Sequence, residues 1–137
     1  MRILIVEPGK HPKKADVEDK LETLQSIVGG CIEAVYPWDD PVALVCDEEG
    51  LYKATEWNRY INEGLAIKGT FFICGLGEDS FADLPDDLSE KYVKLLYHPQ
   101  IFVRTPDGVA IIEMLEEGHG VFMSRGPSLT NCASQKH

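Results

Sequence analysis

The beginning of the chain alternates between apolar runs and polar breaks that predict a strand followed by a helix. Residues 2–6 are mostly branched and apolar, which is typical of a strand covered on both faces, and a Pro-Gly pair ends it. Residues 10–14 form a basic linker, and Asp16 is placed to cap a helix. Glycines at 29–30 close this helix. Its apolar stripe consists of Val17, Leu21, Leu24 and Val28.

Five further apolar segments predict the rest of a sheet. Residues 31–36 alternate between apolar and polar side chains, and the apolar run 42–46 follows after a short loop, so we expect an antiparallel pair. Residues 69–74 predict another strand. Two runs at 101–103 and 109–112 flank a Pro-Asp-Gly turn, which is typical of a hairpin.

The remaining segments predict one further helix and one ambiguous stretch. Residues 51–64 fit a helical face and an extended chain almost equally well, and we interpret them as a short helix or a loop. A second main helix has Pro85 in its first turn and ends before Pro99. Its apolar stripe consists of Leu88, Tyr92 and Leu95.

These elements predict an α+β fold in two layers. We expect one mixed, mostly antiparallel sheet in the order β-α-β-β-(α)-β-α-β-β, with the two main helices packed largely on one face. Residues 1–116 are expected to form a single domain, because 137 residues can bury one core. Residues 117–137 contain glycine and serine and predict a flexible C-terminal tail, in which 121–123 can add an edge strand.

The charge of the chain narrows the classes of partner. There are 23 acidic and 13 basic residues, a net charge of −10, so we expect no direct nucleic-acid binding through a basic surface. Apolar runs are too short for a membrane span, which leads us to expect a cytoplasmic protein without a membrane partner. Two acidic runs without bases predict a possible acidic face made of Asp39, Asp40, Glu78, Asp79, Asp83, Asp86, Asp87 and Glu90.

The candidate chemistry is sparse. Residues 75–80 read GLGEDS after a strand, but they lack the third glycine of a phosphate-binding loop and place acids where a phosphate would lie, so a plain turn is favoured. No C-x-x-C pair, paired histidines or D-x-D-x-D loop is present. The sequence therefore predicts no catalytic residue, no cofactor and no metal site.

An aromatic segment provides a possible interaction surface. Aromatic residues and arginine dominate binding hot spots, and this surface would consist of Tyr52, Trp57, Asn58, Arg59 and Tyr60. The alternative, which we favour, is that Trp57 and Tyr60 cover the open face of a small sheet.

Several motifs follow one another along residues 3–73, namely 3–10 (ILIVEPGK), 21–25 (LETLQ), 27–30 (IVGG), 32–37 (IEAVYP), 40–46 (DPVALVC), 48–50 (EEG), Asn58-Arg59 and 69–73 (GTFFI). Their order resembles a known family, catalogued as domain of unknown function 3846, whose members occur in bacteria, phages and conjugative elements. The resemblance covers about the first hundred residues and implies an intracellular accessory protein of a mobile element or its bacterial host. It carries no catalytic residues. A Leu-Pro pair of the family is replaced by ATEW at 54–57.

Three functional interpretations remain open. The first is a non-enzymatic binding domain whose partner is a protein or a small molecule. The second is an acidic mimic of nucleic acid that inhibits a host restriction or defence protein, which the charge and the mobile-element setting suggest. The third is an enzyme with an unrecognised site.

Overall fold

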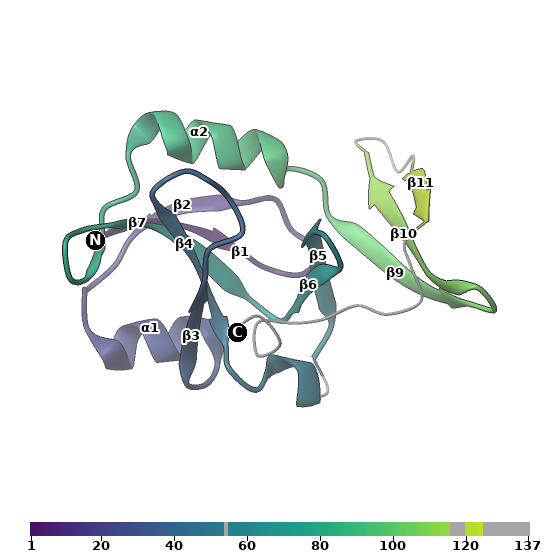
Figure 1. The fold of residues 1–137 in the computed structure, drawn as a ribbon, viewed down its shortest axis with the longest axis horizontal. Coiled ribbons are helices and arrows are strands. Elements are labelled where there is room, and N and C mark those ends of the chain that lie inside the picture. The colour runs from purple at the N-terminus through teal and green to yellow at the C-terminus, as the bar shows by residue number, and fades with distance from the viewer. Residues whose placement is uncertain (54, 116–119, 125–137) are drawn as a thin grey trace.

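The computed structural model describes residues 1–53, 55–115 and 120–124 (Figure 1). The elements in chain order are β1 (Arg2–Val6), β2 (Lys13–Asp16), α1 (Leu21–Val28), β3 (Ile32–Val35), β4 (Val42–Asp47), η1 (Gly50–Tyr52), β5 (Trp57–Asn62), β6 (Leu65–Lys68), β7 (Phe71–Leu76), β8 (Phe81–Ala82), α2 (Asp86–Leu95), β9 (Gln100–Thr105), β10 (Gly108–Met114) and β11 (Gly120–Ser124). Helices with mostly antiparallel strands confirm the predicted α+β class.

The centre of the fold is a six-stranded sheet with antiparallel pairings. Five strands run in the order β2-β1-β7-β4-β3, and the short β8 pairs with β7. β4 and β7 lie inside the sheet because their sequences are apolar at nearly every position, which lets both of their faces be buried. The expected antiparallel pair over 31–36 and 42–46 is confirmed as β3 and β4.

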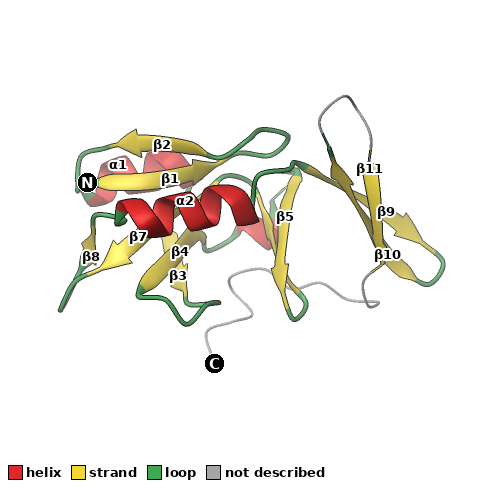
Figure 2. Ribbon diagram, turned by 90° about the horizontal axis from the view of Figure 1, so that it is seen from above, coloured by secondary structure: helices red, strands yellow, loops and turns green. Residues whose placement is uncertain are grey.

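The two helices lie on opposite faces of this sheet, so the expectation of two layers with both helices on one face is wrong. Figures 1 and 2 show α1 and α2 separated by the strands. Leu24 of α1 packs in a cluster with Val45 of β4, whereas Tyr92 of α2 packs in a second cluster with the adjacent Leu44. Successive residues of a strand point to opposite faces. An apolar strand such as β4 therefore needs a cover on each side.

The remaining strands form two smaller sheets, which corrects the expectation of a single sheet. β5 pairs with β6, and β9, β10 and β11 form a three-stranded sheet. The Pro-Asp-Gly hairpin is confirmed, with Thr105 opposite Gly108. The edge strand expected at 121–123 is also confirmed as β11. Residues 116–119 and 125–137 lie outside the described residues, so the domain boundary and the flexible tail stay predictions.

Two local expectations are wrong because strand pairing decided the conformation. Only Gly50–Tyr52 of the ambiguous stretch is a 3₁₀ helix, whereas β5 pairs with β6 around a turn in which Glu63 and Gly64 both have positive φ. Such a turn matches the twist of a hairpin. Lys13 and Lys14 of the basic linker lie in β2 together with Asp16, and α1 begins only at Leu21. β2 is held by its backbone to β1 and needs no apolar run.

Candidate functional site

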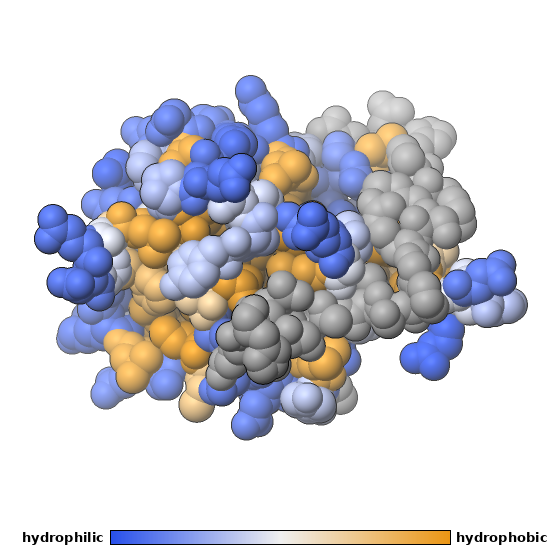
Figure 3. All heavy atoms as spheres, viewed as in Figure 1, coloured by the Kyte–Doolittle hydropathy of each residue, from blue (hydrophilic) through white to orange (hydrophobic). Residues whose placement is uncertain are grey.

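A groove of about 710 Å³ opens on the α1 side of the main sheet. It lies between the start of α1, the edge strand β3 and the turn from β7 to β8. Its floor is apolar, and two of the floor residues, Leu21 and Tyr36, are 58% and 60% exposed. Figure 3 shows apolar side chains on this face of the molecule. The apolar floor consists of Leu21, Leu24, Ile32, Tyr36, Leu76 and Phe81.

The groove exists because α1 is short. Its eight residues span about 12 Å, whereas the six residues of β4 or β7 span about 20 Å. Leu24 and Val28 cover the middle of the sheet. Leu76 at the end of β7 and Ile32 on the edge strand β3 line the groove beside the helix, so their apolar side chains stay accessible to a ligand.

The rim of the groove is acidic. Glu78 and Asp79 stand at the tip of the β7–β8 turn, which is closed by a 2.8 Å hydrogen bond from the Gly77 N–H to the Ser80 carbonyl. Asp19 precedes α1 on the other side. All three carboxylates are exposed, and no lysine, arginine or histidine is among the described residues that line the groove. The rim therefore attracts cations.

The other predicted acids do not continue this rim. Asp40 accepts hydrogen bonds of 2.6 Å from the Lys91 ammonium and from the Tyr92 hydroxyl. The Lys91 bond and then the Tyr92 bond hold the pKa of the Asp40 carboxyl below its ordinary value. Asp40 therefore attaches the β3–β4 loop to α2. Asp39 and Asp87 are exposed.

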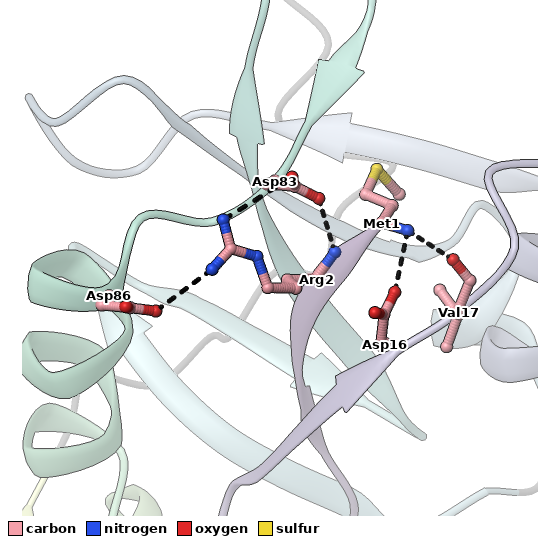
Figure 4. A network of polar contacts seen from close by, with 6 residues as sticks. All are labelled: Met1, Arg2, Asp16, Val17, Asp83 and Asp86. Carbon is pink, nitrogen blue, oxygen red and sulfur yellow. Dashed lines mark hydrogen bonds and ion pairs between the residues drawn. The ribbon is translucent and has the colours of Figure 1, made fainter.

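Asp83, Asp86 and Glu90 also have cationic partners. The Asp83 carboxylate accepts from the backbone N–H of Arg2 at 2.7 Å, a bond that lowers the pKa of Asp83. The Arg2 guanidinium lies between Asp83 and Asp86, as Figure 4 shows. Glu90 is bonded to Lys14, which lowers the pKa of Glu90. Of the eight predicted acids, four are thus ion-paired around α2, and only Glu78 and Asp79 line the groove.

Two members of the predicted aromatic surface are internal. Asn58 and Arg59 are both 0% exposed, so neither contributes to a surface. The Asn58 amide donates to the backbone carbonyls of Val6 and Gly69, each at 2.9 Å. The sequence pattern did not predict that these two residues are internal, because arginine is rarely buried unless it has a partner.

Arg59 connects three parts of the chain. Its Nε donates to the Leu96 carbonyl at 3.1 Å, and its two Nη atoms donate to Asn58 Oδ1 at 2.9 Å and to the Lys10 carbonyl at 2.6 Å. Leu96 is the C-terminal cap of α2. A cation at this position also stabilises the negative end of the helix dipole. Arg59 therefore joins β5 to α2 and to the loop after β1.

The three aromatic residues of the predicted surface lie in different environments. Trp57 stacks on Phe102 of β9 with ring centres 5.3 Å apart, and Lys68 lies over its ring. The Tyr60 hydroxyl accepts from the Gly64 N–H at 2.9 Å within the hairpin. Tyr52 is 80% exposed. Trp57 and Tyr60 thus pack within the β5, β6 and β9 region, and partner binding at Tyr52 stays a prediction.

The sequence pattern did not predict that the apolar residues of the groove form a site. Leu21 belongs to the helical stripe that we expected to be buried, and Leu76 lies between two glycines of a segment interpreted as a plain turn. Only the arrangement of α1, β3 and β7 brings them together. Within 1–53, 55–115 and 120–124, no three His, Cys, Asp or Glu residues are grouped to hold a metal ion. No helix in the same described residues is long and apolar enough to cross a membrane.

Comparison with protein-family models places the groove within a family domain. Residues 1–97 match the model described as domain of unknown function DUF3846. The match ends just after α2, so it includes every residue of the groove and leaves out β9 to β11. Searches of curated proteins and of solved structures found no match. Because the matching segment is most of the chain, the protein belongs to the DUF3846 family.

Proposed function

We propose that the protein is a non-enzymatic binding domain whose groove holds a basic, partly apolar segment of another protein. The observation that carries this proposal is an apolar floor beside a rim of three carboxylates. The floor offers hydrophobic contacts, and the rim selects for lysine or arginine next to the apolar side chains.

The distribution of polar groups favours a protein segment over a small molecule. Small-molecule sites fix their ligand with a few polar groups that converge inside the pocket. Here the carboxylates of Asp19, Glu78 and Asp79 are exposed at the rim, around a floor of aliphatic and aromatic side chains. This arrangement suits a chain whose apolar side chains enter the groove while its cationic ends stay at the rim.

The setting implied by the family resemblance is the cytoplasm of a bacterium that hosts a phage or a conjugative element. The proposed role is that of an accessory protein that engages a host or element protein there. A nucleic-acid mimic would need carboxylates in an unbroken array, whereas Asp40, Asp86 and Glu90 are paired with cations. Our proposal also differs from a purely ionic decoy in that the partner must bury apolar side chains in the groove.

The test is an NMR titration of ¹⁵N-labelled protein with a short peptide that alternates lysine with valine. We expect shift changes in α1, β3 and the β7–β8 turn. Leu21→Ser should weaken binding by about tenfold, because about 1.4 kcal/mol of apolar contact is lost. Leu95→Ser is the matched control, since Leu95 is 57% exposed on α2, away from the groove.

The role of charge is tested with the double variant Glu78→Gln and Asp79→Asn, which should weaken binding of the same peptide. The control is the double variant Asp39→Asn and Asp87→Asn, which should leave binding unchanged. A peptide that alternates glutamate with valine should not bind. Equal effects of Leu21→Ser and Leu95→Ser, or shift changes spread over the whole surface, would refute groove binding. Binding that depends on the carboxylates but not on Leu21 would support the ionic decoy instead.

A further inference from the structure

The outer edge of β3 lies beside the groove and presents backbone groups of its own. β3 ends the strand order of the main sheet and pairs with β4 on one side. Within the part of the chain that the structure describes, no other strand pairs with the opposite side. A strand edge of this kind can accept an added strand.

The register identifies the backbone groups that point outward. The β3–β4 register begins with Ile32 opposite Asp47, and one step before it the Glu48 N–H donates to the Cys31 carbonyl at 2.8 Å. Hydrogen-bonded and non-bonded pairs alternate along antiparallel strands. Residues 33 and 35 therefore direct their N–H and C=O groups toward β4. Ile32 and Ala34 direct theirs away from the sheet.

The two outer strands of the sheet differ in how they resist edge pairing. β2 carries Lys13 and Lys14, and lysines are a common protection of sheet edges. β3 has the sequence IEAV, no proline and a regular register. Its acid, Glu33, is 6% exposed, so that charge does not guard the edge. β3 is thus the outer strand that remains suited to strand addition.

Two hollows flank this edge, one on each face of the sheet. The groove includes Ile32, which packs with the α1-side cluster. A second hollow of about 470 Å³ includes Val35, which packs with the α2-side cluster, and it is also lined by Pro37 and Glu63. A hydrogen bond of 2.9 Å from the Asn62 amide to the Pro37 carbonyl holds the β5–β6 hairpin beside this hollow. Alternate side chains of an added strand would enter the two hollows in turn.

We propose that the basic, apolar partner segment binds as an extended strand along the outer edge of β3, with alternate side chains in the two hollows. This inference rests on the proposed function and adds the binding mode and the backbone groups that carry it. A second copy of this chain is disfavoured as the occupant. It would bring together two chains of net charge −10, with Glu78 and Asp79 at the groove and Glu63 at the second hollow.

The experiment follows the amide hydrogen exchange of β3 with and without the lysine–valine peptide. In the free protein, residues 33 and 35 should exchange slowly and Ile32 and Ala34 quickly. The peptide should slow Ile32 and Ala34. Ala34→Pro removes one outward N–H without touching the β3–β4 ladder, and proline is tolerated at such edges. We expect it to weaken the peptide by about tenfold. The control is Ala34→Val, because valine is similar in size to proline and keeps the N–H; this variant should bind the peptide normally.

A second measurement does not depend on how Ala34→Pro folds. It uses two peptides, one methylated at the backbone nitrogen of every valine and the other at that of every lysine. Each peptide lacks the N–H donors along one edge of its extended strand. Only one of the two should still bind the unaltered protein. Unchanged exchange at Ile32 and Ala34, or binding by both methylated peptides, would overturn strand addition. If Leu21→Ser still weakens binding in that case, the groove proposal survives. If Leu21→Ser has no effect, both proposals fail.

Discussion

Replacement of Arg59 by methionine tests whether a buried guanidinium holds the fold together. Methionine has a similar length and is apolar, so the change removes the charge and its hydrogen bonds while it leaves only a small cavity. The three shortest bonds that are lost go to the carbonyls of Leu96 and Lys10 and to the side-chain oxygen of Asn58. A longer bond of 3.3 Å to the Asn58 carbonyl is lost with them. These groups belong to separate segments, so their loss should loosen α2 from β5.

Two opposing contributions set the magnitude. Hydrogen bonds from a charged donor to buried oxygens contribute about 2 kcal/mol each, so three of them give about 6 kcal/mol. Burial lowers the pKa of Arg59 to about 10, with a partial opposing effect of Glu113. The lost hydration of the charge costs about 3 kcal/mol. The hydrogen bonds therefore win, and Arg59→Met should lower the free energy of unfolding by about 3 kcal/mol.

The assay is urea unfolding followed by the fluorescence of the two tryptophans and by circular dichroism. A loss of about 3 kcal/mol corresponds to a midpoint about 1.5 M lower in urea. Arg104→Met is the control, because Arg104 is exposed on β9, and it should stay within about 0.5 kcal/mol of the unaltered protein. An Arg59→Met variant as stable as this control, or more stable than the unaltered protein, would refute the reasoning.

Two further predictions concern the close contacts of β7 and α2. A Cβ at Gly75 would lie 2.2 Å from the Asp83 carbonyl oxygen, so Gly75→Ala should cost about 2–3 kcal/mol in a thermal melt; Gly77→Ala, whose Cβ lies 3.2 Å from the nearest atom, should cost clearly less. Burial and the bond to Asp40 raise the pKa of the Tyr92 hydroxyl, which stays protonated while an unfolded tyrosine ionises near pH 10. Stability should therefore fall as the pH rises above about 10, and Tyr92→Phe should show a shallower fall in urea titrations.

The local pattern of apolar and polar residues correctly predicted the elements in which apolar residues mark the buried positions or a turn motif marks a hairpin. β1, β4 and β7 are continuous apolar runs, and the β9–β10 hairpin contains a Pro-Asp-Gly turn. The stripe of α1 correctly predicts that Leu24 and Val28 are buried. Pattern failed for β2 and β5, because the first is an edge strand with lysines and the second mixes polar and aromatic residues. In both cases the partner strand decides the conformation.

The candidate site could be predicted only in part. Glu78 and Asp79 were identified as acids of a possible surface, and they do line the groove. The apolar floor could not be foreseen, because Leu21 and Leu76 are exposed only where the short α1 leaves the sheet uncovered. Arg59 was assigned to a surface and is instead buried.

The sequence by itself determined the α+β class, most strands of the main sheet, the acidic charge and the family resemblance, because these depend on residues that are close together along the chain. The tertiary structure alone decided that α1 and α2 cover opposite faces, that four acids pair with distant cations, and that Arg59 joins three segments. It also placed the groove beside the open edge of β3. The physical reason is that burial and ion pairing depend on which distant segments meet, and strand periodicity does not record the partner.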